Sequence, residues 1–384
     1  MRVLFLLNAR FPTEKAYGIQ VEAMARGFAQ TQDKNDATAI AYPRRQKGVA
    51  KQIEGVELVP FGWQLSLRVP GLFQVLRLLG AVQSLHVVDR WKPDVVIVND
   101  PLQAAIQASR QKTKIIWDLH DIPDLSRWSH RFLIKRILKR AYGVVSTNKL
   151  KIDALKAVFG SVPPTQIVPN PPAFPIETYR NISRASARQV IGIQQDEKVI
   201  VYAGQLFEWK GVDTLIRSAE FAPSDVRIHI VGGTGADLEH SKKISATTES
   251  HKGARVFLHG QMPVDRIPHW LRAADLIAIP NSGKFEVSRR DTNPMKLQEA
   301  AAAQDPILAS DLPSIRESVC GSEGVLFAPA DDPRAWGAAI SDFFSLAPDS
   351  PKKKKIDLAA QNAAWILNPE QRALVLRRFF DTLS

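Results

Sequence analysis

Short runs of apolar residues alternate along the chain with longer segments in which apolar positions recur at helical spacing. Strands that alternate with helices in this way predict an α/β fold built on parallel sheets. The strand-like runs of the first half are 3–7, 37–42, 94–98, 114–118 and 143–146. Those of the second half are 199–203, 227–231, 276–280 and 307–309.

Helical spacing is clearest in three segments, which are 19–29, 335–346 and 369–383. A proline-rich segment at 161–175 separates the two series of strands. We interpret this segment as a stiff linker and 143–146 as the last strand of the first half. A chain of 384 residues is long enough for two cores. The predicted domains are residues 1–172 and 173–365.

Composition limits the class of protein. Apolar residues make up 45% of the chain and charged residues 23%, which is ordinary for a globular protein. A single cysteine, Cys320, excludes an internal disulfide framework and a four-cysteine metal site. The N-terminal apolar run is too short for a signal-peptide core, and no stretch is apolar enough to span a membrane. We therefore expect a cytoplasmic protein whose first apolar run is a strand.

The formal net charge of +12 suits anionic partners such as a nucleotide, a nucleic acid or an acidic membrane face. No acid occurs between Leu125 and Ile152, and the stretch from Arg127 to Arg140 mixes cations with apolar residues. This stretch fits a helix that lies on the anionic inner face of a membrane, and it also fits a surface helix packed on its own sheet. The segment 63–91 is a second candidate for lipid or acceptor contact.

The sequence also predicts an anion site at the start of a helix. Asn293 can serve as the N-cap and Pro294 as the first helical residue, where a missing N–H costs nothing. The amides of Met295 and Lys296 then point out of the helix at the positive end of its dipole, which suits a phosphate. Glu299 lies more than a turn further in, where its carboxylate can reach a sugar hydroxyl attached to that phosphate.

Seven residues separate Asp291 from Glu299, and the segment 309–317 reads Ala-Ser-Asp-Leu-Pro-Ser-Ile-Arg-Glu. This pattern resembles the paired-acid motif of the retaining family 4 glycosyltransferases, which belong to the group 1 glycosyl transferases and adopt the GT-B fold. The resemblance implies two Rossmann-like domains that face each other across a cleft, with a last helix at about 366–384 packed back on the first. This chain departs from the family by having Asp as the first acid and Gln304 in place of a glycine.

The loop that begins at Gly204 carries a second part of the resemblance. It is similar to the family segment Gly-Arg-x4-Lys-Gly-x-Asp, whose arginine and lysine clamp the donor diphosphate. Lys210 and the glycine after it match this segment, whereas the arginine is Gln205 here. Lys210 must then supply more of the charge stabilisation, unless an arginine at 289–290 substitutes.

His120 lies just past the run 114–118, at the usual ligand-facing end of a parallel strand. In the resembling family a histidine at this place hydrogen-bonds the donor sugar near the reacting carbon, although a lone histidine can also be structural. The catalytic set that the resemblance implies is His120, Lys210, Asp291 and Glu299. The implied donor-binding set is Gly18, Gly204, Gln205, Lys210, Gly233, Gln261, Thr292, Asn293, Pro294, Met295, Lys296 and Glu299.

The resemblance implies transfer of a hexosyl group from a UDP-, GDP- or other nucleoside-diphosphate sugar to a glycan or lipid-linked acceptor, with retention of configuration. Lysine and oriented amides can stabilise the departing diphosphate without a metal. Beyond the donor substrate we expect no cofactor, and no nucleic-acid partner. Two alternatives stay open: an epimerase or inverting transferase on the same fold, and a non-catalytic nucleotide or nucleic-acid binder that uses the basic surface.

Overall fold

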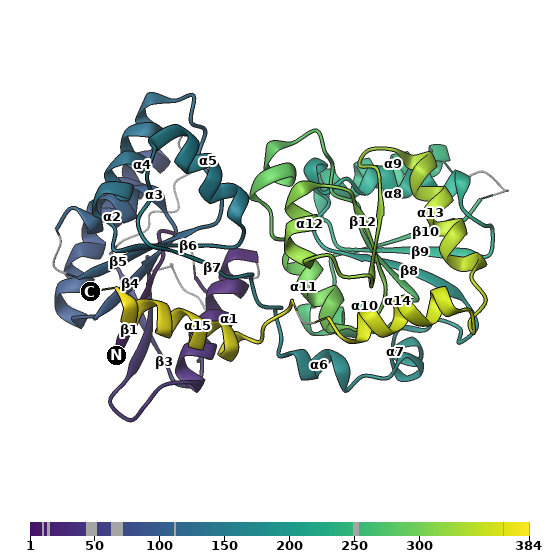
Figure 1. Ribbon diagram of the computed structural model, residues 1–384, viewed down its shortest axis with the longest axis horizontal. Coiled ribbons are helices and arrows are strands. Elements are labelled where there is room, and N and C mark those ends of the chain that lie inside the picture. Colours follow the sequence, from purple (N-terminus) through teal and green to yellow (C-terminus); the bar gives the residue numbers. More distant parts are fainter. Residues whose placement is uncertain are drawn as a thin grey trace. The chain divides into compact units, whose positions relative to one another are not determined.

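The computed structural model describes residues 1–9, 11–13, 16–43, 52–62, 72–110, 113–248, 253–363 and 365–383. The chain forms two compact units: Met1–Pro171 together with Leu367–Ser384 is unit 1, and Pro172–Ile366 is unit 2. Each unit contains a parallel sheet with helices packed on it (Figure 1). The predicted fold class, α/β with two Rossmann-like domains, is confirmed.

The sheet of unit 1 has seven strands in the order β3-β2-β1-β4-β5-β6-β7. The strands are β1 Arg2–Leu6, β2 Ala37–Pro43, β3 Val56–Phe61, β4 Val95–Val98, β5 Lys114–Leu119, β6 Gly143–Ser146 and β7 Thr165–Ile167. All neighbouring strands are parallel. The strand order reverses between β1 and β4, and ligands of such sheets bind beyond the carboxyl ends of the strands near this point.

Two strands of unit 1 correct the sequence analysis. β7 pairs with β6, so the prediction that 143–146 is the last strand is wrong, and part of the predicted linker is sheet. Prolines flank its three residues and interrupt the pattern, and pairing with β6 stabilises a run too short to be recognised alone. β3 was not predicted either. It contains Pro60, which a strand tolerates when it lies at the edge of a sheet.

The helices of unit 1 are α1 Ala16–Gln30, α2 Leu72–Trp91, α3 Pro101–Ala108, α4 Trp128–Arg140, α5 Lys149–Phe159 and α15 Pro369–Thr382. Alternate residues of β1 face opposite sides of the sheet. Val3 and Phe5 join a core with α1 and α15, which lie side by side (Figure 1). Leu4 and Leu6 join a second core beneath α2, α3, α4 and α5.

The sheet of unit 2 has six parallel strands in the order β10-β9-β8-β11-β12-β13. The strands are β8 Lys198–Ala203, β9 Val226–Val231, β10 Arg255–Gly260, β11 Leu276–Ile279, β12 Ile307–Ser310 and β13 Val325–Ala328. The order reverses between the central strands β8 and β11. The loops that follow these two strands are therefore the expected place for a ligand.

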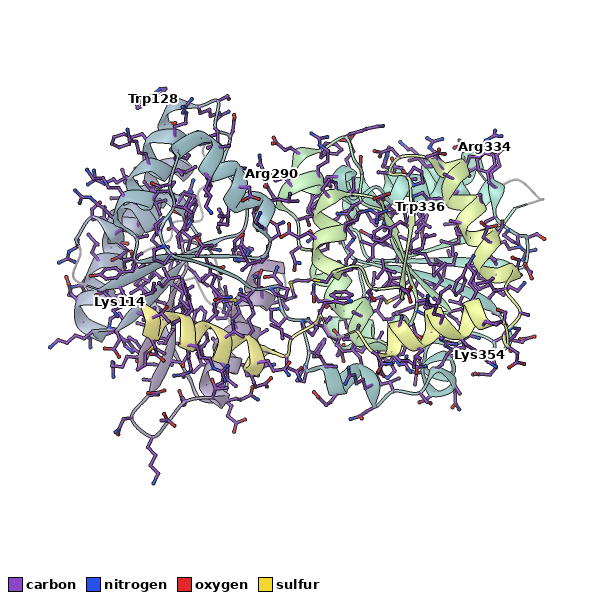
Figure 2. The ribbon with its side chains drawn as sticks, viewed as in Figure 1. Lys114, Trp128, Arg290, Arg334, Trp336 and Lys354 are labelled. Carbon is purple, nitrogen blue, oxygen red and sulfur yellow. The ribbon has the colours of Figure 1, made fainter. Side chains whose placement is uncertain are left out.

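The α-helices of unit 2 are α6 Ile176–Arg180, α7 Arg184–Ile191, α8 Val212–Ser218, α9 Gly235–Thr248, α10 Ile267–Ala273, α11 Met295–Ala302, α12 Pro313–Val319, α13 Pro333–Ser345 and α14 Pro351–Gln361. Helices α10, α11 and α12 share one core with the sheet, and α8, α9 and α13 share the other. Trp336 of α13 is fully buried in the second of these cores (Figure 2).

Candidate active site

The loops after β8 and β11 touch at the point where the strand order of unit 2 reverses. Gly211 permits the contact, because its φ is +65° and a Cβ added to it would lie 2.0 Å from the carbonyl oxygen of Pro280. The N–H of Ser282 donates to the carbonyl of Trp209 at 3.0 Å and joins the same two loops. The glycine of the Lys-Gly pair is therefore required by close packing.

Lys210 ends the short 3-10 helix η1 (Glu208–Lys210), immediately before that glycine. Its Nζ lies 3.6 Å from the centroid of the Trp209 ring, a distance at which the ring face attracts a cation. The side chain is half-buried. The matched loop therefore places an ammonium group beside the switch point.

Helix α11 begins one residue later than predicted. Met295 is its first residue, and Pro294 precedes it with an extended ψ of 124° and no capping side chain. The prediction that Asn293 caps the helix is wrong, because the residue at the N-cap is Pro294. Nδ2 of Asn293 donates to Oγ of Ser318 in α12 at 2.8 Å. The first amides of α11 still belong to Met295 and Lys296, and the first amides of a helix have no partner within it.

The side chain of Lys296 runs beneath the loop after β8. The residue is 8% exposed, and Nζ donates to Oη of Tyr202 at 2.5 Å and lies 3.9 Å from the centroid of that ring. Burial and the nearby positive charge of Lys210 hold the pKa of Lys296 well below its ordinary value, although Glu299 acts in the opposite direction. Two lysines from different elements thus converge on one place.

Glu299 is fixed by groups from the start of unit 2. Oη of Tyr179, in α6, lies 3.5 Å from Oε1 of Glu299. Burial raises the pKa of Glu299, although Lys296, the backbone of Ala173 and Tyr179 oppose the rise. Burial and the charge of Glu299 also raise the pKa of Tyr179, so the hydroxyl keeps its proton and donates. The carboxylate is therefore oriented before any ligand binds.

Asp291 ends a π-helical turn, η4 (Val287–Asp291), and is 5% exposed. Its carboxylate accepts hydrogen bonds from Nε and Nη2 of Arg290 at 2.5 and 3.0 Å. Arg290 (Figure 2) also pairs with Glu286, so it is engaged by two acids. The N–H of Thr292 donates to the carbonyl of Val287 at 2.8 Å and closes the turn. Such turns are frequent at functional sites.

The glycine run after β9 lets two loops cross. A Cβ on Gly232 would lie 1.9 Å from the carbonyl oxygen of Gly204, and one on Gly233, whose φ is +81°, would collide with Leu206. Gln205 is exposed beside this crossing, and Gln261 is exposed just after β10. The structure thus gives Gly233 a packing reason that the sequence analysis did not contain.

In unit 1, His120 follows β5 and its side chain is 23% exposed. Its Nε2 lies 2.8 Å from Oδ2 of Asp118, which is buried. Burial alone would raise the pKa of Asp118, but His120, Arg372 and Lys151 together lower it. Because an ionised carboxylate only accepts, Nε2 of His120 carries the hydrogen of this bond, which leaves Nδ1 for a different partner.

A buried lysine supports the loop that carries this histidine. Nζ of Lys151, in α5, donates to the carbonyls of Leu119 and His120 at 3.0 and 2.9 Å and to Oγ1 of Thr147 at 2.6 Å. Gly18 lies in the first turn of α1, where a Cβ would lie 2.3 Å from Cγ2 of Thr13. Close packing therefore explains this glycine.

Most predicted site residues belong to unit 2, on the loops after β8, β9, β10 and β11, whereas Gly18 and His120 belong to unit 1. Tyr179, Tyr202 and Asp118 were not predicted from the sequence, and Lys296 was predicted to contribute only its backbone amide. An acid within an otherwise apolar strand was a usable signal for Asp118. The two tyrosines carried no such signal.

Within the described ranges, no cluster of three or more His, Cys, Asp or Glu side chains is arranged to hold a metal ion. Among the same residues, no helix is both long enough and apolar enough to span a membrane.

Two family models match the chain. One, described as glycosyl transferases group 1, matches residues 183–363, and the other, described as a glycosyl transferase 4-like domain, matches residues 16–173. Both models describe glycosyl transferases, and together they span most of the chain. The family resemblance found in the sequence is thus confirmed for both halves of the chain.

Among curated relatives, a D-inositol 3-phosphate glycosyltransferase of Nocardia farcinica is 27% identical over 315 residues, which are 77% of this chain and 66% of the relative. The enzyme of the same name from Xylanimonas cellulosilytica is 27% identical over 165 residues, or 42% of this chain and 38% of the relative. The matches therefore span less than two thirds of the length of either relative.

Among solved structures, sucrose-phosphate synthase from Thermosynechococcus elongatus has a TM-score of 0.80 at 16% identity and covers 100% of this chain and 98% of its own. Anabaena HepE in complex with UDP-glucose has a TM-score of 0.73 at 17% identity, and the match covers 100% of this chain and 99% of HepE. At these identities the likeness establishes only the fold that the two proteins share with this chain.

Proposed function

We propose that the protein transfers a hexosyl group from a nucleoside-diphosphate sugar to a glycan or lipid-linked acceptor, with retention of configuration and without a metal ion. Unit 2 binds the donor and unit 1 binds the acceptor. One observation carries the proposal: Lys210, the start of α11 and an oriented Glu299 converge at the switch point of unit 2. Structural neighbours solved with UDP and UDP-glucose support the choice of donor.

The charge that develops on the leaving diphosphate determines what the site must supply. The ammonium group of Lys210 and the amides of Met295 and Lys296 stabilise that charge. All of these donors are held by the fold before the reaction, so little reorganisation is needed in the transition state. In this proposal these donors neutralise the charge of the leaving diphosphate, a task that a metal ion performs in other enzymes.

The remaining side chains position the donor sugar and the nucleotide. Glu299 binds the ribose hydroxyls, and Asp291, oriented by Arg290, binds hydroxyls of the sugar. His120 contacts the sugar near the reacting carbon through the nitrogen opposite its bond to Asp118. The acceptor oxygen bonds to the anomeric carbon from the side on which the carbon–phosphate-oxygen bond breaks, and the departing phosphate oxygen takes the acceptor's proton.

A thermal-shift panel of UDP- and GDP-sugars tests donor binding. A ligand at about 100 times its Kd stabilises the folded state by roughly 2.7 kcal/mol, which raises the melting temperature measurably. We expect one nucleotide class to give this rise and Lys210→Ala to reduce it. If no nucleotide sugar shifts the melting temperature of the unaltered protein, the proposed function is wrong.

Product analysis tests the reaction itself. We expect the anomeric proton of the first-formed product to show the donor's configuration by NMR, with the same rate in the presence of EDTA. An inverted product would identify an inverting transferase, and conversion of the donor without acceptor would identify an epimerase. Loss of the activity in EDTA would contradict metal independence.

We also propose that unit 1 contacts the anionic inner face of a membrane through α4. Ile134 and Ile137 pack into the core, whereas Trp128 and Phe132 are 80% and 57% exposed. Trp128 is labelled in Figure 2. The cations exposed on the same helix are Arg131, Lys135, Arg136 and Lys139. Exposed aromatic groups among cations suit the boundary between anionic headgroups and acyl chains.

Helix α2 extends this surface. Its side chains at 75, 78, 79 and 82 recur at helical spacing, and each is about half exposed, with values of 52%, 47%, 50% and 48%. The helix packs on α3, which in turn packs on α4. The segment 63–91 was predicted to contact lipid or acceptor. Its residues 63–71 lie outside the described ranges, and its helical part carries this apolar stripe.

Vesicle flotation separates the contributions to membrane binding. We expect binding to phosphatidylglycerol vesicles but not to phosphatidylcholine vesicles, and each neutralised cation of α4 should cost about 1 kcal/mol. Changing Lys352, Lys354 and Lys355 of α14 to Gln removes a similar charge from unit 2 and serves as the control. Equal flotation of the α4 and α14 variants would exclude this surface.

A further inference from the structure

Building on the proposed function, we propose that the ammonium group of Lys296 is the second cation of the donor-diphosphate site. It takes the place of the arginine that the family carries at the position of Gln205. From the sequence, Lys296 is expected to make only a backbone contact, and an arginine at 289–290 is the candidate for the missing cation. The structure instead offers the side chain of Lys296.

The position of Lys296 connects it with the loop that lacks the arginine. Nζ of Lys296 donates to Oη of Tyr202 at 2.5 Å, and this hydroxyl donates in turn to the carbonyl of Gln205 at 2.6 Å. The ammonium is therefore two hydrogen bonds away from the backbone of the very residue that replaces the arginine. In this chain the proposed second cation therefore lies on α11, and not on the loop after β8.

Gly204 places no side chain against the ammonium on the side of the loop. Its φ is +152°, and a Cβ added there would lie 3.1 Å from Nζ and 3.2 Å from Cε of Lys296. Any other residue at this position would put carbon against the ammonium and restrict the approach of an anion. On its other side, Nζ faces the Tyr202 ring at 3.9 Å from the centroid.

The charges around Lys296 favour an anionic ligand. Lys210, from η1, repels it, and Glu299, one turn further along α11, attracts it. Within the part of the chain that the structure describes, Oη of Tyr202 is the hydrogen-bond acceptor of this ammonium. An ammonium has three donors, so burial leaves it short of acceptors. A diphosphate would supply oxygens and remove the repulsion between the two lysines.

A set of four proteins tests the substitution of one cation for another. UDP serves as the probe, and its Kd is measured by calorimetry for the unaltered protein, Lys296→Met, Gln205→Arg and the double variant. We expect Lys296→Met to weaken binding by about tenfold or more and Gln205→Arg to restore most of the loss in the double variant. Lys198→Met, at the opposite end of β8, removes one exposed charge and should leave the Kd unchanged.

Proton uptake tests the same inference without any substitution at Lys296. Burial and the charge of Lys210 lower the pKa of Lys296, and the negative charge of a bound phosphate would raise it again. At about pH 8, where a phosphate with a second pKa of roughly 6 is already ionised, UDP binding should take up a fraction of a proton. Calorimetry in buffers of different ionisation enthalpy measures this uptake.

The results separate this inference from the proposed function. If the unaltered protein binds no nucleotide, the proposed function fails. If it binds UDP without proton uptake, and Lys296→Met binds UDP as tightly, only the role of Lys296 is overturned. A double variant as weak as Lys296→Met would also overturn it, provided that Gln205→Arg alone keeps the melting temperature of the unaltered protein.

Discussion

The two units each bury a lysine near the carboxyl ends of their strands, but the two lysines have different surroundings. Lys151 of unit 1 is fully buried and donates to three oxygens, those of Leu119, His120 and Thr147. Lys296 of unit 2 is nearly as buried, yet among the described residues it has a single oxygen acceptor and a like charge nearby.

The difference shows how an architectural cation can be told from a ligand-binding one. Burying a charge is costly unless its donors are paired. In unit 1 the protein itself pairs them, so Lys151 shapes the loop that carries His120. In unit 2 the pairing is incomplete, and the remaining deficit favours a bound anion. Burial alone would have placed both lysines in the same class.

The largest effect should come from removing the satisfied lysine. Lys151→Met keeps a long side chain but leaves two carbonyls and a hydroxyl without their donor, so we expect a loss of about 3–5 kcal/mol in the free energy of unfolding. Urea denaturation measures it. Lys149→Met, on the same helix with 71% of its side chain exposed, is the control and should change stability by less than about 0.5 kcal/mol. A comparably small loss for Lys151→Met would remove the contrast between the lysines.

Removing the charge of Lys210 should affect transfer and not folding. We expect Lys210→Ala to lower kcat/KM by about 10²–10³-fold, or roughly 2.7–4 kcal/mol, because it removes a fixed cation from the leaving group. Steady-state kinetics and thermal denaturation measure the two effects. Lys243→Ala on α9 removes an exposed charge elsewhere in unit 2 and should match the unaltered protein. If Lys210→Ala keeps the kcat/KM of the unaltered protein, the proposal that Lys210 and Lys296 together bind the diphosphate is wrong.

A smaller effect is expected at the buried acid behind His120. Asp118→Asn keeps the shape but removes the charge that fixes the hydrogen on Nε2, so we expect kcat to fall by about tenfold. The Kd of the donor should stay unchanged, because Asp118 itself does not contact the donor in this proposal. Asp121→Asn changes an exposed neighbouring acid and is the control. A change confined to the donor Kd would assign Asp118 a different role.

The alternation of apolar runs was sufficient to predict the fold class, because the interior strands of both sheets carry their own pattern. It was insufficient for β3 and β7, whose stability comes from pairing with β2 and β6. It also misplaced the start of α11 by one residue, because Pro294 occupies the N-cap, while the side chain of Asn293 bonds to Ser318, 25 residues later. Short patterns and local caps are decided by partners distant in the sequence.

The candidate site shows the same division. Lys210 could be predicted, because its loop is a contiguous motif with a required glycine. The ammonium of Lys296 could not, because its position depends on Tyr202, 94 residues away, and on Gly204 having no side chain. Asp118 and His120 are only two residues apart, so an acid within an apolar strand, next to a candidate histidine, was a sufficient signal for this pair.

The smallest effect is also the sharpest test of the comparison. Lys296→Met exchanges a poorly paired buried cation for an apolar side chain of similar length, and Tyr202 keeps its bond to the carbonyl of Gln205. We therefore expect the ligand-free protein to be unchanged or more stable by up to about 1 kcal/mol, unlike Lys151→Met. Saturating UDP should reverse the order, because it stabilises the unaltered protein more than the variant. Thermal denaturation with and without UDP measures both values, and a Lys296→Met protein destabilised by several kcal/mol without ligand would make this lysine architectural as well.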